Sequence, residues 1–357
     1  MAESFAMNGG DGIYSYTKNS EHQKKCSISI QGRLQEAINK GFDTVTLASL
    51  SGNKFCLVDL GCSVGPNTFF NMKTIIDAIQ KKHNISKKLD FHVFFNDRVS
   101  NDFNTLFANL SPERRYFAAG VPGSFYDQLF PPSSIHFAYS SYSLPWLTKV
   151  PEALLSRSSP AWTGMKIHSL GASPESSAAY SAQYEKDMER FLNARASEIV
   201  AGGMMAIITP GVPDGVDPST IFSAILFDFV EYSLADMVNE GILDENQVQC
   251  FNMPIYCPSP KEMISHVERN GCFTIESLEL TKPAGAKKNA DEPVFGAAES
   301  LVMHVRAAFE AVFTKHFGSE LTDDIFARTL NKTAALSLRL KSAYMGDTEL
   351  FLVLKRK

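Results

Sequence analysis

The residues from Asp59 to Gly65 form the segment of the chain best suited to holding a small molecule. They read Asp-Leu-Gly-Cys-Ser-Val-Gly and begin inside a short apolar run, 55–61. Gly61 and Gly65 let the backbone turn tightly and approach a ligand closely, because glycine carries no Cβ atom. The spacing differs from the Gly-x-Gly-x-x-Gly of a dinucleotide site. It suits a ligand without a diphosphate, and a generic strand-turn-helix without a ligand is the alternative.

A second acid, Asp97, ends the next apolar run along the chain, 91–97. In doubly wound folds, an acid at the end of the second strand accepts hydrogen bonds from ribose hydroxyls. A carboxylate suits two neighbouring hydroxyl donors. Asp59 is then placed to face the other end of the ligand, directly or through water. Together these residues point to S-adenosylmethionine, which has a ribose and a methionine end but no diphosphate.

Alternating strands and helices are expected to position these residues. Short apolar runs predict strands at 55–61, 91–97, 134–143, 204–210, 272–280 and 350–357. Apolar residues at helical spacing predict helices at 67–83, 178–200, 219–241 and 300–317. The order strand, helix, strand is typical of a parallel sheet. The stretch 213–267 is mostly helical and ends in a Pro-rich loop, as a helical insertion above a sheet would.

Composition and charge narrow the class of protein. The chain has 357 residues, of which 44% are hydrophobic and 20% charged, and a net charge of −5. This length can bury a large core, and the acidic balance argues against a nucleic-acid partner. The N-terminus lacks a secretory pattern, and no run of 18 apolar residues occurs. Six cysteines without CxxC spacing favour reduced thiols in the cytoplasm.

Several longer strings make the chain resemble the SABATH family of plant methyltransferases. They are SYTKNSEHQ (15–23), CLVDLGCSVGPNT (56–68), FFNDRVSNDFNTLF (94–107), VPGSFYDQLFP (121–131), SSYSLPWLTKVP (140–151), FNMPIYCPSP (251–260) and HFG (316–318). The matches run in family order over nearly the whole chain. The resemblance implies transfer of a methyl group from S-adenosylmethionine to the carboxylate of a small plant metabolite. A few members instead methylate ring nitrogens of xanthines on the way to caffeine.

The resemblance also implies an architecture. It is an α/β fold with a Rossmann-like class I methyltransferase core, whose sheet is mostly parallel with an antiparallel last strand, and a helical cap. We expect an N-terminal lid at 1–30, a core at 31–212 with 268–282 and 348–357, and a cap at 213–267 and 283–347. Members are commonly homodimers, so we expect a cytoplasmic homodimer that binds a small-molecule substrate and no membrane.

Positions matched to the family motifs imply a cofactor site. Tyr16 and Ser20 belong to the lid over the cofactor. Asp59, Cys62 and Asn67 line the methionine part. Asp97 holds the ribose, and Arg98 lies beside the adenine. The adenine is flanked by Ser124 and Phe125, with Ser141 nearby.

Matched positions also imply a substrate site. Gln23 and Trp146 carry N–H groups that can bind a carboxylate, and Tyr142 lies on the pocket wall. Tyr16 and Pro145 border the same space. The apolar part is shaped by Leu226, Phe227, Tyr256, Val305 and Ala308.

Two departures from the family pattern matter. Pro145 stands where many members have His or Met, and proline has no side-chain donor for a ligand. Some members also have a metal site, and at its positions this chain has Thr163 and Gln249. Both are poor ligands for a hard cation that prefers carboxylate oxygen. We therefore predict that no metal is bound.

The predicted chemistry needs no catalytic base. A carboxylate is ionised at neutral pH, so positioning by Gln23 and Trp146 is enough for an in-line displacement. We interpret His22 as a surface residue of the lid and His136 as a core residue. Xanthine N-methylation remains the alternative, with Ser223, Tyr232 and Tyr344 as candidate polar partners. A catalytically silent binder is the third possibility, and the intact cofactor motifs argue against it.

Overall fold

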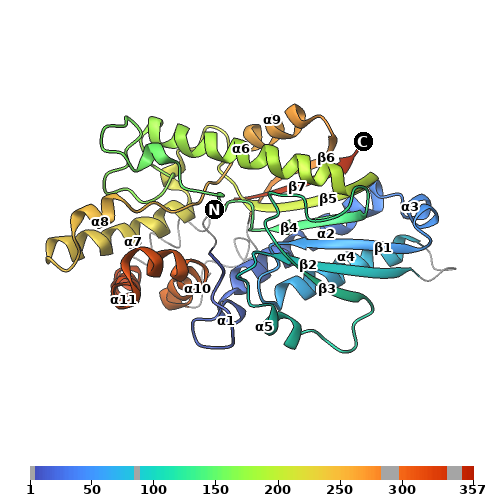
Figure 1. Cartoon of the computed structure of the whole chain (residues 1–357), viewed down its shortest axis with the longest axis horizontal. Coiled ribbons are helices and arrows are strands. Elements are labelled where there is room, and N and C mark those ends of the chain that lie inside the picture. Colours follow the sequence, from blue (N-terminus) through green and yellow to red (C-terminus); the bar gives the residue numbers. More distant parts are fainter. Residues whose placement is uncertain (1–4, 84–88, 283–296, 336–347) are drawn as a thin grey trace.

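A seven-stranded sheet forms the centre of the computed structural model, which describes residues 5–83, 89–282, 297–335 and 348–357 (Figure 1). The strands are β1 (Lys54–Leu60), β2 (Asp90–Asp97), β3 (Phe117–Pro122), β4 (Ile135–Ser141), β5 (Ile199–Pro210), β6 (Phe273–Thr281) and β7 (Glu349–Arg356). Their order is β3-β2-β1-β4-β5-β7-β6. Strands β1 to β5 pair in parallel, and β7 runs antiparallel to both β5 and β6. This confirms the predicted class I methyltransferase sheet.

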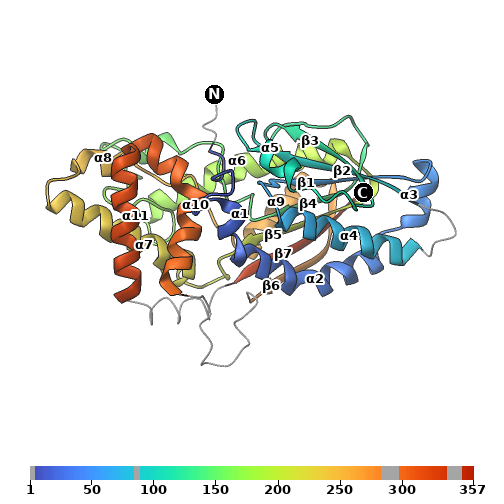
Figure 2. The ribbon, with the colours of Figure 1, turned by 90° about the horizontal axis from the view of Figure 1, so that it is seen from below.

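Helices cover both faces of the sheet and extend beyond one end of it (Figures 1 and 2). They are α1 (Tyr16–Asn19), α2 (Glu21–Gly41), α3 (Thr44–Leu50), α4 (Asn67–His83), α5 (Phe103–Ala108), α6 (Pro174–Glu198), α7 (Phe222–Asn239), α8 (Glu245–Gln249), α9 (Pro260–Asn270), α10 (Ala297–Phe317) and α11 (Ser319–Ala335), with 3-10 turns η1 (Glu152–Leu154) and η2 (Pro218–Thr220). Helix α4 matches its prediction at both ends. Helix α2 and strand β3 were not predicted.

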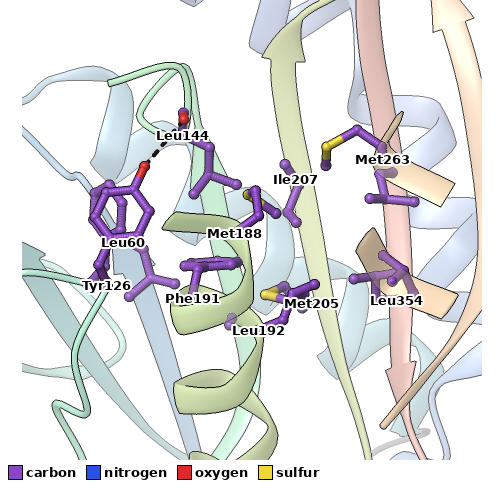
Figure 3. Packing of buried hydrophobic residues seen from close by; sticks show 14 of the residues in the cluster. Leu60, Tyr126, Leu144, Met188, Phe191, Leu192, Met205, Ile207, Met263 and Leu354 are labelled. Atoms are coloured by element: carbon purple, nitrogen blue, oxygen red, sulfur yellow. Dashed lines mark hydrogen bonds between the residues drawn. The ribbon is translucent and has the colours of Figure 1, made fainter. Parts of the chain in front are cut away.

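Alternating residues of each central strand bury against different helices. In β5, Met204, Ala206 and Ile208 join the cluster under α2 and α4, whereas Met205 and Ile207 face α6. Figure 3 shows the second cluster, where Met188, Phe191 and Leu192 of α6 pack over these two strand residues. Burial on both faces is the reason that the parallel strands read as nearly continuous apolar runs.

Four helices, α7, α8, α10 and α11, lie together beyond the carboxyl ends of the parallel strands (Figure 2). They share a separate core that includes Phe229, Val230, Phe313 and Phe326. Within the described residues, no helix has the length and apolar character needed to cross a lipid bilayer.

Two helices cross the predicted domain boundaries. Helix α2 continues without interruption from the predicted lid into the predicted core, and α9 packs against α6 and β6 of the sheet layers. Residues 283–296 and 336–347 of the predicted cap lie outside the described residues. We retain the three-part division as a proposal, with the boundary after residue 30 falling inside a continuous helix.

Candidate active site

A cavity opens where the carboxyl ends of the parallel strands meet the cap helices. It encloses about 1320 Å³, including its open mouth. Gly61, Asp97 and Ser141, at or next to the ends of β1, β2 and β4, line one side, and α7 and α10 line the other. The strand order reverses between β1 and β4, and ligands of open α/β sheets bind at such a point.

A smaller pocket adjoins this cavity and shares part of its wall. Both spaces are lined by Tyr16, Gln23, Gly61, Ser63 and Ser141. The smaller pocket also contains the predicted residues Asp59, Cys62 and Asn67. The larger one contains Asp97, Arg98 and Phe125. Eight of the ten predicted cofactor residues therefore border one continuous space.

The other two predicted cofactor residues serve the surrounding structure. The buried Ser20 accepts a hydrogen bond through its carbonyl oxygen from Asn67 Nδ2 at 3.0 Å. The hydroxyl oxygen of Ser124 accepts one from the backbone N–H of Tyr126 at 3.3 Å. Neither Ser20 nor Ser124 lines the two spaces. Ser20 holds Asn67, which lines the smaller pocket, and Ser124 holds Tyr126, which packs beside the larger cavity.

The loop after β1 needs glycine at position 61, where the side chain of Ser143 packs directly on the backbone. The φ of Gly61 is +86°, and a Cβ added there would lie 2.0 Å from Ser143 Oγ. Asp97 holds this loop against β2, since its Oδ2 accepts from Ser63 N at 2.7 Å and its Oδ1 from Arg98 N at 2.7 Å. Ser63 Oγ is buried without a hydrogen-bond partner in the described chain. A polar ligand with hydroxyl and amino groups fits these groups.

Two carboxyl groups lie in this region, Asp59 buried and Asp97 half-buried. Asp59 accepts a hydrogen bond from Thr68 Oγ1 at 2.5 Å. Burial raises the pKa of Asp59 to about 7, although the Thr68 hydrogen bond acts in the opposite direction. Burial also raises the pKa of Asp97. A cationic group of a ligand would stabilise the ionised form of either carboxyl group.

Gln23 is oriented by a chain of hydrogen bonds that reaches across to α10. His304 Nδ1 lies 2.9 Å from the carbonyl oxygen of Asn19, which can only accept, so Nδ1 carries the proton. His304 Nε2 then accepts from Gln23 Nε2 at 3.0 Å. Burial lowers the pKa of His304, which favours this neutral form. One N–H of the Gln23 amide remains for a ligand.

Trp146 lies in the cavity wall between the sheet and the cap. Its ring stacks on Phe309 with centroids 4.9 Å apart, and its carbonyl accepts from Tyr126 Oη at 2.7 Å. The indole N–H makes no hydrogen bond within the described residues. Tyr142 and Pro145 line the same cavity, as do the predicted apolar residues Leu226, Phe227, Val305 and Ala308.

Tyr256 does not lie in this cavity, although it was predicted to shape it. Its hydroxyl donates to Glu262 Oε1 at 2.5 Å, and its ring packs on Tyr184 with centroids 5.0 Å apart. The Pro-rich segment turns this side chain toward α6 and α9. The neighbours Ile255 and Cys257 line the cavity instead. The position was taken from a loose match to the family, and an error of one residue in an extended segment reverses the side chain's direction.

His22 lines the cavity and is not the surface residue that we expected. Its ring meets Tyr142 edge-on at 5.7 Å, and burial lowers its pKa to about 3. The sequence contained the signal, because His22 belongs to a stripe with Cys26, Ile30 and Leu34 at intervals of four residues on α2. His304 and Glu349 are two further polar residues of the cavity that sequence reasoning missed.

His136 is a core residue, as predicted. It is buried in β4, where its Nδ1 accepts from the backbone N–H of Cys56 at 3.1 Å and its ring packs on Phe55. Burial lowers its pKa to about 4, so the ring is neutral near pH 7.

The positions of the family's metal site hold a protein cation. The guanidinium of Arg157 donates to Gln249 Oε1 at 2.5 Å, and Thr163 Oγ1 donates to Asn252 Oδ1 at 3.2 Å. A second positive charge at this place would be repelled by Arg157. The absence of a bound metal remains a prediction.

Comparisons with known proteins agree with this geometry. Residues 2–357 match the family described as SAM-dependent carboxyl methyltransferase. The chain is 40% identical to loganic acid O-methyltransferase of Catharanthus roseus, over 99% of this chain and 95% of that protein. It is 35% identical to farnesoic acid carboxyl-O-methyltransferase of Arabidopsis thaliana, over the full length of both. The solved structure of loganic acid methyltransferase with SAH is 39% identical and superposes with a TM-score of 0.92, over 98% of each chain.

Proposed function

This chain belongs to the SABATH family of S-adenosylmethionine-dependent carboxyl methyltransferases, and we propose that it converts the carboxylate of a small plant metabolite into a methyl ester. The observation that carries the proposal is the position of Gln23. Its side chain borders both the smaller pocket and the apolar cavity. A carboxylate bound there would face the methyl group of the cofactor.

We assign the smaller pocket and the adjoining end of the cavity to S-adenosylmethionine. Asp59 and Asn67 would hold its methionine end, and Asp97 its ribose. Arg98 and Phe125 would border the adenine. Tyr16 and Cys62 would close the pocket on the side of α1 and the loop after β1. The buried, partnerless oxygens Ser63 Oγ and Gln23 Oε1 would accept hydrogen bonds from the bound molecule or its waters.

Two N–H donors would hold the two oxygens of the substrate carboxylate. One is the remaining N–H of Gln23, oriented by His304, and the other is the indole N–H of Trp146. Charge-assisted hydrogen bonds of this kind are stronger than neutral ones. When bound, S-adenosylmethionine supplies a methyl group already activated on a sulfonium, and in-line displacement transfers it. The protein residues contribute proximity and alignment.

The polar lining of the cavity supports the alternative reaction, N-methylation of a xanthine, in one respect. Glu349 lines the cavity and could accept a ring N–H proton, so a missing base no longer argues against this reaction. His22 also lines it, but its lowered pKa makes the ring a weak proton acceptor. Of the candidate polar partners, Ser223 lines the cavity and Tyr232 is 41% exposed. Tyr344 lies outside the described residues. The family description nevertheless favours the carboxylate.

We also propose that the enzyme is a cytoplasmic homodimer. The six cysteines are free thiols, which suits a reducing compartment. The family resemblance supports the dimer. Light scattering coupled to gel filtration should give twice the mass of 39.4 kDa. A monomer at micromolar concentration would contradict this proposal.

A methyl-transfer assay tests the reaction directly. Labelled S-adenosylmethionine is incubated with aromatic, fatty and terpenoid acids and with xanthines, and products are identified by mass and by lability to mild alkali. We expect a base-labile methyl ester from at least one acid. A base-stable product from a xanthine, with no ester from any acid, would replace our proposal with the alternative.

We expect cofactor affinity to depend on pH through Asp59. Its pKa of about 7 lies above the usual value near 4, so the folded apoenzyme favours the neutral acid. The contribution of this raised pKa to the free energy of unfolding is fully present below about pH 4 and is lost as the pH rises through 7. The amino group of the cofactor would pair with the ionised form. Affinity measured by calorimetry should therefore rise between pH 5.5 and 7, by at most about tenfold per pH unit, and then level off.

Asp59→Asn is the control for this prediction. The variant keeps the side-chain shape but cannot ionise, so its affinity should be weaker and should change little over the same pH range. A wild-type affinity that stays constant from pH 5.5 to 8 would show that Asp59 does not titrate with cofactor binding.

A further inference from the structure

Glu349 is a buried carboxyl group in the wall of the cavity that the proposed reaction does not use. It is the first residue of β7 and is 1% exposed. The hydroxyl of Tyr142 donates to its Oε1. Its Oε2 has no hydrogen-bond partner among the residues that the structure describes. One oxygen of this buried carboxyl group therefore accepts a hydrogen bond, and the other accepts none from the described residues.

Among the residues that the structure describes, none supplies a counter-charge to Glu349. Arg33 is the cation that influences it, but Arg33 pairs with Glu279 at 2.9 Å at the protein surface. The ring of His22 lies within 4.8 Å of the carboxyl group and is kept neutral, because burial lowers its pKa to about 3. Burial likewise raises the pKa of Glu349.

A purely structural role would not require a carboxyl group here. Holding the Tyr142 hydroxyl needs one acceptor atom, and a buried oxygen left without a partner is destabilising. The Cys26 thiol and the Thr281 hydroxyl also act on this carboxyl group, yet no described residue donates a hydrogen bond to Oε2. A donor that arrives with the bound molecule would satisfy this oxygen. Glu349 and Gln23 line the same cavity, so this carboxyl group lies in the wall that would surround a substrate bound at Gln23.

We propose that Glu349 binds a hydroxyl group of the substrate, so that the acid methylated by this enzyme is a hydroxylated carboxylic acid. This inference rests on the proposed carboxyl methylation. A hydroxyl satisfies Oε2 in either protonation state, since it donates to a carboxylate and accepts from a neutral acid. An ammonium group would pair only with the ionised form. A plain hydrocarbon acid would leave Oε2 buried and unpaired.

Matched pairs of acids test this inference. Benzoic, cyclopentanecarboxylic and cyclohexanecarboxylic acids are each compared with their 2-, 3- and 4-hydroxy derivatives, where these exist. Each is also compared with the corresponding amino-substituted acids. For each pair, the ratio of kcat/KM values is measured. This ratio does not depend on the fraction of folded enzyme, so a partly unfolded variant still gives a valid result.

We expect the wild-type enzyme to prefer a hydroxylated member by about tenfold or more, because a site built around a substrate hydroxyl discriminates against its absence. Glu349→Leu, which has a similar volume and no polar atom, should reduce the ratio to about one. Glu349→Gln retains an acceptor oxygen and should keep most of the preference. Glu279→Leu removes an exposed carboxylate from the neighbouring strand β6, outside the cavity, and should leave the ratio unchanged.

Three results would overturn the inference. The first is a wild-type enzyme that methylates the unsubstituted acids as well as the hydroxylated ones. The second is an equal loss for both members of a pair in Glu349→Leu, and the third is a preference for the amino derivative. If no acid of any kind is methylated, the proposed carboxyl methylation itself has failed, which is distinguishable from these results.

Discussion

Replacing Arg195 by methionine is expected to lower the free energy of unfolding by about 3–5 kcal/mol, because it leaves a buried charge without its partner. Arg195 is fully buried on α6, and its Nε donates to Glu198 Oε2 at 2.8 Å. Its two Nη atoms donate to the carbonyl oxygens of Phe125 and Asp127 at 2.7 and 3.1 Å. Urea denaturation measures the loss.

The same change should weaken cofactor binding, because this ion pair holds the loop that carries Phe125. Glu198 Oε1 accepts from the backbone N–H groups of Leu129 and Phe130 at 2.5 and 3.0 Å. Arg195 and Glu198 therefore fasten both halves of the segment 125–130 to the end of α6. Cofactor affinity of the folded variant, measured by calorimetry, should fall together with stability.

Arg190→Met is the matched control. Arg190 also lies on α6 and also pairs with Asp127, but its side chain is 52% exposed. Pairs of this kind contribute little, so its loss should change the free energy of unfolding by less than about 1 kcal/mol. If the two methionine variants lose similar stability, the burial of the Arg195–Glu198 pair is not what stabilises the loop.

Gln23→Glu is expected to lower kcat/KM for acid substrates by about 100-fold or more. The replacement is nearly isosteric, but it removes the N–H that we propose for binding the substrate and opposes one carboxylate with another. Like charges placed together at a binding site cost several kcal/mol. Initial rates over a range of acid concentrations, at a saturating concentration of cofactor, measure the effect.

Trp146→Phe is the companion variant. It retains an aromatic ring against Phe309 and removes only the indole N–H, so we expect a loss of about tenfold in kcat/KM. Trp146 does not border the smaller pocket, so the affinity for S-adenosylmethionine should not change. If Gln23→Leu, which carries no charge, slows methylation of the same acid as much as Gln23→Glu does, charge repulsion is not the cause.

Local patterns predicted six of the seven strands and singled out Asp59, Gly61 and Asp97, which border the two spaces assigned to the ligands. A buried parallel strand is a continuous apolar run, and a turn that must approach a ligand needs glycine, so both can be read from neighbouring residues. Strand β3 was missed because it is an edge strand of small residues, with Phe117 64% exposed. Family resemblance supplied the cofactor and the carboxyl chemistry, since those depend on motifs preserved in order along the chain.

The polar groups of the substrate cavity were decided by the tertiary structure. His22, His304 and Glu349 lie in three distant parts of the sequence, and only the packing of α2, α10 and β7 brings them to one wall. The position of Tyr256 was also decided there, because Glu262 and Tyr184 offer its side chain a place outside the cavity.

The sequence by itself thus determined the fold class, the cofactor and the class of reaction, because each rests on short motifs that can be recognised in order along the chain. The tertiary structure alone decided which polar side chains line the cavity and which protonation state their surroundings favour. The tautomer of His304 and the unpartnered oxygen of Glu349 exist only through contacts made across the chain, in an environment from which water is excluded.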